Sequence, residues 1–210
     1  MQHRMRDEIT LHDHMRIEPV ILEGNGVRLE PLAFSHVPGL CAVGLDPDLW
    51  SITMTLIRNE EEMKQYVGNA LALQEKGTAL PFATIDKKSG RVAGSTRFGN
   101  IDTANKRVEI GWTWLGKEFQ RTHVNTSAKC LMLKYAFEVW GCHRVEFKTD
   151  VINQRSRNAL LRIGAKEEGI LRRHQITATG RVRDSVYFSI IDSEWPAAKT
   201  RLEGMVDDHR

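Results

Sequence analysis

The residues best suited to chemistry lie where a predicted strand passes into a predicted helix, between Gln120 and Thr126. The first amides of a helix have no partner within the helix, and the helix dipole favours negative charge at that end. Asn125 or Thr126 can cap this helix, while the neighbouring backbone N–H groups can bind a phosphate group. The junction alone predicts an anion site and specifies no reaction.

The cysteines and histidines show no disulfide or metal pattern. Cys41, Cys130 and Cys142 are odd in number and lack a C-x-x-C spacing. His12 and His14, near the N-terminus, have no third fixed ligand. We therefore predict no metal site and a protein of the reducing cytoplasm.

The elements that position the junction follow from hydrophobic periodicity. Alternating apolar residues predict strands at 27–32, 80–85, 92–98, 108–114, 145–149, 169–176 and 185–191. Helical spacing predicts helices at 35–43, 59–77, 124–141 and 153–163. We expect an α/β (α+β) fold with a mixed, mostly antiparallel sheet of about seven strands. Pro31 favours an edge position for the first strand.

Length and composition limit the classes of protein that fit. A chain of 210 residues with 41% hydrophobic content predicts one domain, residues 19–210, behind a polar tail at 1–18. The net charge of +3 is spread along the chain, which excludes the concentrated basic face of a nucleic-acid binder. Since no segment approaches the ~20 apolar residues of a membrane span, we predict a soluble protein.

Three motifs in sequence order carry a family resemblance. They are the run Val108–Leu115, the Gln120 loop with its helix, and Asn153–Ser156 in a helix that ends at Ile163-Gly164-Ala165. Together they resemble the GCN5-related N-acetyltransferase (GNAT) superfamily, and within it the RimJ/RimL-like branch of ribosomal-protein N-terminal acetyltransferases. The likeness spans roughly Gly26 to Trp195. It implies a sheet splayed in the middle and transfer of an acetyl group from acetyl-CoA to a primary amine.

The resemblance also implies where acetyl-CoA would bind. Trp112, Thr113, Trp114 and Leu115 take the position that contacts the pantetheine arm. The diphosphate position is taken by Gln120, Arg121, Thr122, His123, Val124, Asn125 and Thr126. Asn153 matches an asparagine that contacts the arm, Ser156 lies one turn later, and Arg157 can face the adenosine phosphates.

The phosphate loop departs from the family pattern Q/R-x-x-G-x-G/A. His123 and Asn125 stand where small residues are expected, and glycine is the residue that allows the closest approach of backbone to phosphate. Arg121 and His123 can replace lost backbone contacts by charge-assisted bonds to phosphate, or they can be solvated loop residues. The sequence leaves both interpretations open.

Direct attack by an amine needs a base, and Glu109 is the best candidate because related enzymes often place a glutamate on this strand. The alternative is a carboxylate paired with Lys106 or Arg107. The tyrosine that many relatives use as an acid toward the leaving thiolate is replaced by Leu160. Ser156 can assist instead, and Tyr187 is a possible substitute.

Two functions remain open from the sequence: an N-acetyltransferase working through a ternary complex, and a non-catalytic or regulatory acyl-CoA-binding protein of the same fold. The acceptor would be a small-molecule or peptide N-terminal amine. Arg172, Arg173 and His174 would favour an acidic acceptor, or they form a solvated face of their strand. A homodimer through the last hairpin or a sheet edge is plausible.

Overall fold

The computed structural model describes residues 15–207, so His3, His12, His14 and most of the predicted tail lie outside the described residues. Met15 is already buried against the core. The carbonyl oxygen of Arg16 accepts a hydrogen bond from Nε1 of Trp140 at 3.0 Å. No helix within residues 15–207 is both long and apolar enough to cross a membrane.

The structure is built on one eight-stranded sheet with strand order β1-β2-β3-β4-β5-β6-β8-β7. The strands are β1 (Leu22–Gly24), β2 (Val27–Pro31), β3 (Leu80–Asp86), β4 (Arg91–Asp102), β5 (Arg107–Leu115), β6 (Arg144–Asp150), β7 (Lys166–Ile176) and β8 (Val182–Ile191). All neighbours are antiparallel except β5 and β6. The predicted mixed, mostly antiparallel sheet is confirmed.

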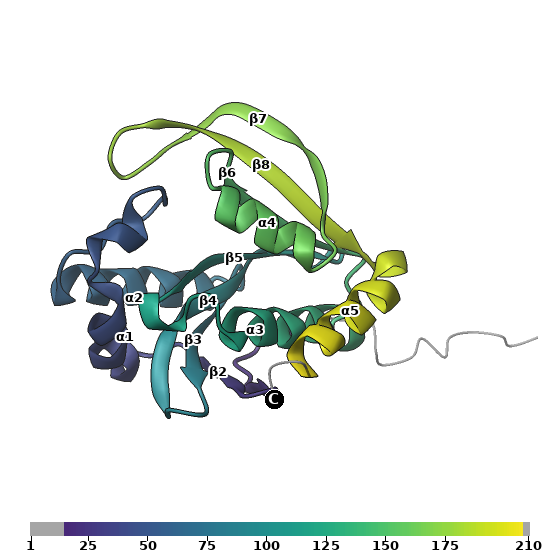
Figure 1. Ribbon diagram of the computed structural model, residues 1–210, viewed down its shortest axis with the longest axis horizontal. Helices are drawn as coiled ribbons and strands as arrows, with labels where there is room; N and C mark the ends of the chain where they lie inside the picture. Colours follow the sequence, from purple (N-terminus) through teal and green to yellow (C-terminus); the bar gives the residue numbers. More distant parts are fainter. Residues whose placement is uncertain (1–14, 208–210) are drawn as a thin grey trace, which may run out of the picture.

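Within residues 15–207, five α-helices accompany the sheet: α1 (Val37–Gly44), α2 (Glu60–Glu75), α3 (His123–Lys134), α4 (Gln154–Arg162) and α5 (Trp195–Asp207). In Figure 1, α3 and α5 lie together, while the β7–β8 hairpin arches over α4. A π-helical turn, η4 (Tyr135–Val139), extends α3, and short 3₁₀ turns are η1 (Phe34–His36), η2 (Pro47–Trp50), η3 (Lys117–Phe119) and η5 (Asp192–Glu194).

Local signals account for most of these boundaries. The Asn59 side chain accepts a hydrogen bond from the Glu62 amide at 2.9 Å, which caps α2, and three glutamates follow at its positive end. Past the other end of α2, Gly77 takes a φ of +68°. Alternating strand residues, among them Phe82, Phe98, Phe147 and Phe188, are fully buried and fill the core.

The fold differs from the sequence-based expectation in two elements. The predicted first strand is not at the edge, because the three-residue β1 pairs outside it. Pro31 is nevertheless tolerated, because the β1 pairing reaches only to Leu29. The C-terminal helix α5 was also missed, although Trp195, Ala198, Leu202 and Val206 lie at helical spacing and are all buried.

Candidate active site

The sheet opens between its two parallel strands. β5 and β6 pair only at Arg107↔Arg144, Val108↔Val145 and Glu109↔Glu146, although β5 continues to Leu115 and β6 to Asp150. The splay predicted for the middle of the sheet is therefore present. Beyond Glu109, the backbone N–H and C=O groups of β5 no longer pair with β6, and they are available to a ligand in the opening.

A bulge in β5 sets the direction of the side chains along this opening. Arg97 of β4 pairs with Gly111 and Ser95 pairs with Trp114, so that Trp112 and Thr113 together stand opposite one residue. Trp112 takes a φ of +50°. Its ring lies against Gly99, where a Cβ atom would approach to 2.3 Å.

Thr113, in the bulge, and Trp114, which follows it, face opposite sides of the sheet. The ring of Trp114 packs against Trp50, with centroids 5.2 Å apart, and its Nε1 donates to the hydroxyl of Tyr66 at 3.3 Å. The hydroxyl of Thr113 instead meets Nζ of Lys129, on α3, at 2.9 Å. The strand segment predicted to hold the pantetheine arm thus has aromatic packing on one face and a lysine on the other.

Glu109 lies at the closed end of the opening, and only 3% of it is exposed. Its Oε2 accepts a hydrogen bond from Nδ2 of Asn100 at 2.7 Å and lies 3.5 Å from Nζ of Lys148. The alternative pairing with Arg107 is not what the structure shows, because Arg107 pairs with Asp102 and Glu146. Asn100 and Lys148 thus both contact the same oxygen of the carboxylate.

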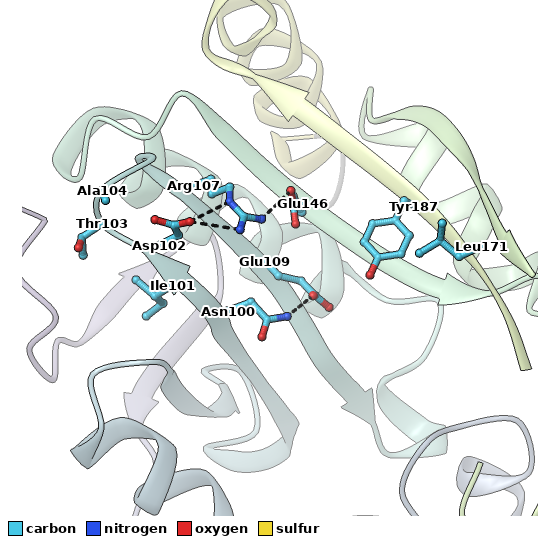
Figure 2. Close-up of a pocket in the computed structure, with 10 residues that line it drawn as sticks. All are labelled: Asn100, Ile101, Asp102, Thr103, Ala104, Arg107, Glu109, Glu146, Leu171 and Tyr187. Carbon is cyan, nitrogen blue, oxygen red and sulfur yellow. Dashed lines mark hydrogen bonds and ion pairs between the residues drawn. The ribbon is translucent and has the colours of Figure 1, made fainter. Parts of the chain in front are cut away.

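A cavity of about 740 Å³ opens beside Glu109. Figure 2 shows Tyr187 and Leu171 reaching it from β8 and β7, opposite the strand that carries Glu109. Its lining contains three carboxylates, those of Asp102, Glu109 and Glu146, and one cation, Arg107. This lining suits a positively charged group better than the acidic acceptor that the sequence favoured.

Tyr187 belongs to a cluster of titratable side chains behind the cavity. Nζ of Lys148 lies 5.7 Å from the centre of its ring, and the ring of His174 lies 5.9 Å away. Burial lowers the pKa of His174, and the charges of Lys148 and Arg183 lower it further. The structure leaves Nδ1 of His174 buried without a hydrogen-bond partner.

The helix of the predicted phosphate junction begins earlier than its apolar spacing indicated. Thr122, rather than Asn125 or Thr126, is the N-cap, and its hydroxyl accepts a hydrogen bond from the Val124 amide at 3.3 Å. Thr126 is buried inside the helix, where its hydroxyl accepts from Nη2 of Arg162 at 2.9 Å. Thr122 caps the helix because its backbone is extended just before the first helical residue, His123. The 3.6-residue period of apolar side chains does not reveal this backbone conformation.

His123 is turned away from the open end of α3. Its Nε2 lies 3.4 Å from the carbonyl oxygen of Gly26 and 3.4 Å from Oδ1 of Asp86. Gly26 provides the space, since a Cβ there would lie 2.9 Å from the ring. The ring is therefore neither a solvated loop group nor directed at a phosphate site, whereas Arg121 is exposed with a φ of +61°.

Gln120 links the two sides of the opening. Its Nε2 donates to the carbonyl oxygen of Leu115 at 3.0 Å, and its Oε1 accepts from Nη1 of Arg155 at 2.6 Å. Arg155, on the first turn of α4, brings a further cation to this end of α3. Arg155 is not among the predicted site residues.

The remaining predicted site residues lie at the start of α4. Asn153 is its N-cap, and its Oδ1 accepts from the Ser156 amide at 3.0 Å. Arg157 donates to the Val151 carbonyl at 3.3 Å and to Glu167 at 3.1 Å. Leu160 is buried in the same helix.

Comparison with known proteins places this geometry in a family. Residues 27–166 match the model of the GNAT acetyltransferase domain. The chain belongs to the GNAT acetyltransferase family. The predicted family and enzyme class, an N-acetyltransferase, are confirmed.

Relatives of this GNAT acetyltransferase support the predicted branch. A putative ribosomal N-acetyltransferase, YdaF of Bacillus subtilis (strain 168), is 36% identical over 110 residues, which are 52% of this chain and 59% of that protein. A GCN5-related N-acetyltransferase from Brucella melitensis is 36% identical, with a TM-score of 0.83 over 90% of this chain and 86% of that one. Mycobacterium smegmatis RimJ, solved with a CoA disulfide, is 23% identical and shares the fold, with a TM-score of 0.74 over 89% and 93%.

Besides Arg155, three residues of the acetyltransferase site were not predicted from the sequence. Asn100 and Lys148 reach Glu109 from β4 and β6, and nothing in their local sequence indicates that contact. The sequence does indicate that Lys129 is buried, because the apolar Met132 and Leu133 follow it by three and four residues and so share its helix face. Both are fully buried in the structure. Burial lowers the pKa of Lys129 to about 7.

The thiols of the acetyltransferase are not activated. Burial raises the pKa of Cys142 to about 12 and also raises that of Cys130. Because the thiolate is the nucleophile, neither side chain suits a covalent acetyl intermediate. Among residues 15–207, no three His, Cys, Asp or Glu side chains are grouped as they would be around a metal ion.

Proposed function

We propose that the chain transfers the acetyl group of acetyl-CoA directly to the primary amine of a peptide or protein. The observation that carries this proposal is the position of Glu109, which is the last residue of β5 paired with β6 and lines the adjoining cavity. An acceptor in the cavity and a donor in the opening would then meet at one buried carboxylate. Direct transfer between two bound substrates requires such proximity.

The residues around the opening suit a CoA group. The backbone of 112–115, released from β6, can bond to an amide-containing arm, and the first amides of α3 can bind a diphosphate. Arg121 and Arg155 add positive charge, while the ring of His123 is directed elsewhere. The CoA disulfide in Mycobacterium smegmatis RimJ supports this assignment.

The start of α4 would hold the same group. Asn153 uses Oδ1 as a cap, which leaves its Nδ2 to donate to the arm. Ser156 remains a proposed contact and helper toward the leaving thiolate. Arg157 would have to leave Glu167 to reach a phosphate, so its part depends on exchange of that ion pair.

Bound acetyl-CoA supplies the acetyl group as an activated thioester. Glu109 accepts the proton of the acceptor amine at Oε1, because Asn100 and Lys148 both hold Oε2. The acidic lining attracts the amine in its protonated form. The name of the Bacillus subtilis relative favours a protein N-terminus, and the three free cysteines favour the reducing cytoplasm as the site of action.

Calorimetry and thiol release together test the proposal. Acetyl-CoA should bind, and thiol release should depend on an added peptide with a free N-terminus, with the N-acetylated peptide as the matched control. No binding at millimolar acetyl-CoA would contradict the proposal. Binding without amine-dependent release would favour the non-catalytic alternative, and release only with small amines would overturn the acceptor class.

A further inference from the structure

Lys129 is a buried lysine for which the proposed function has no use. It lies on α3 facing the sheet, and 6% of it is exposed. Its recorded hydrogen bond goes from Nζ to Oγ1 of Thr113, at 2.9 Å. Within the described part of the chain it has no carboxylate as an ion-pair partner, and the lowered pKa of about 7 comes from desolvation alone.

A short row of polar atoms connects this amine to the opening. Oγ1 of Thr113 also lies 2.8 Å from Oγ1 of Thr96, whose own partner is Sδ of Met132 at 3.7 Å. Thr96 is buried, whereas Thr113 is exposed, on the part of β5 that β6 leaves unpaired. Nζ is therefore one hydrogen bond away from the surface that the proposed function gives to the pantetheine arm.

The opening thus has titratable groups of opposite character on its two faces. Glu109, the proposed base, lies on the cavity face, near Lys148 and Tyr187. Lys129 lies on the α3 face, and Leu160 of α4 has no proton to give. Acetyl transfer needs a group of each kind, because the amine loses a proton and the departing sulfur gains one.

We propose that Lys129 stabilises the departing sulfur of CoA and supplies its proton. The inference rests on the proposed function. The bond from the amine nitrogen to the acetyl carbon forms, and the carbon–sulfur bond breaks with its electron pair on sulfur. Sulfur then takes a proton from Nζ while Glu109 takes one from the amine, and solvent restores both groups.

The lowered pKa suits this role. A thiol has an ordinary pKa near 8.5, so an ammonium with a pKa of about 7 gives its proton to a thiolate downhill, whereas an ordinary lysine would not. A positive charge within ~4–6 Å also favours the thiolate form. A sulfur bound within that distance of Nζ would be stabilised before the proton moves.

The test measures the thiol of bound CoA in the enzyme–CoA complex, without turnover. Thiolate formation is followed by ultraviolet absorbance against pH for the wild type, Lys129→Met and the matched control Lys134→Met, an exposed lysine of the same helix. Methionine suits a buried apolar site, so the first variant should fold. We expect wild-type thiolate to form from about pH 7, where Lys129 still carries part of its charge, Lys129→Met to form it only near the ordinary thiol pKa of about 8.5, and Lys134→Met to match the wild type.

Turnover gives a second, independent readout. Lys129→Met should lower kcat by about 100-fold with little change in the Kd of CoA, and should remove the fall in kcat as pH rises through about 7. Equal thiolate titrations in the wild type and Lys129→Met, or an unchanged kcat, would overturn the inference. Failure of the wild type to bind CoA would overturn the proposed function, and this inference with it.

Discussion

Glu109 acquires its chemical character from residues far away in the sequence. Lys148 lies 39 positions later and Asn100 nine positions earlier, yet both contact Oε2. Asn100 reaches it from left-handed backbone, with a φ of +48°, at an irregularity between β4 and β5. A glutamate on a strand of alternating apolar and polar residues is common. The contacts with Asn100 and Lys148 distinguish Glu109 from such a glutamate.

Replacing Glu109 by glutamine tests its role as the base. Glutamine keeps the size of the side chain and cannot accept the proton, so kcat should fall by about 10²–10⁴-fold. Glu60→Gln, at an exposed glutamate paired with Lys64, serves as the control. An unchanged kcat in Glu109→Gln would reject the assignment.

At the scale of elements, the start of α3 depends on Thr122. Its hydroxyl accepts from the Val124 amide and donates to the Phe119 carbonyl oxygen at 2.7 Å, which joins the helix to the preceding turn. The cap orders the amides proposed to bind the diphosphate. The start of α3 and the proposed phosphate loop are therefore held together by the same residue, Thr122.

Thr122→Ala should lower the free energy of unfolding by about 1 kcal/mol, because it removes the cap. Thr122→Ser keeps the hydroxyl and should retain most of that stability. Chemical denaturation of the two variants makes the comparison. An equal loss in both would show that the methyl group, and not the cap, carries the effect.

At the scale of the whole molecule, ion pairs join the strands beyond the opening. Glu168 of β7 binds Arg144 of β6 and accepts from the hydroxyl of Ser189 on β8 at 2.7 Å. The hydrogen bond from Arg144 lowers the pKa of Glu168 to about 2. This cluster links three strands, including the edge strand β7. Ile170 and Ile176 of β7 are exposed, which is consistent with a homodimer through this edge, and the homodimer stays a prediction.

Glu168→Gln tests the cluster through the pH dependence of stability. Because the folded pKa lies below the ordinary value of 4.5, the contribution of Glu168 is complete above pH 4.5 and is lost as pH falls toward 2. The variant should be less stable than the wild type at pH 7, by no more than about 1 kcal/mol for a partly exposed pair. The difference should vanish near pH 2.

Denaturation curves between pH 2 and 7 measure this difference. Glu75→Gln, at an exposed glutamate near the end of α2, controls for loss of charge alone. A difference between wild type and Glu168→Gln that stays constant down to pH 2 would contradict the assigned ion pair. The single domain proposed for residues 19–210 predicts one cooperative transition throughout.

The sequence by itself determined most of the elements and their order, though not the helix α5, because hydrophobic periodicity, caps and glycines act over a few residues. It also indicated the family and Glu109, through motifs that are continuous along the chain. It missed β1, which is too short for a period, and it misplaced the cap of α3, because a cap is defined by backbone conformation.

Only the tertiary structure decided which charges meet. The bulge at Trp112 directs Thr113 toward Lys129, and the short β5–β6 pairing brings Lys148 to Glu109. It also turned His123 onto the Gly26 turn and away from a phosphate. Such contacts depend on strand register and on the desolvation produced by packing, and neither property can be read from neighbouring letters of the sequence.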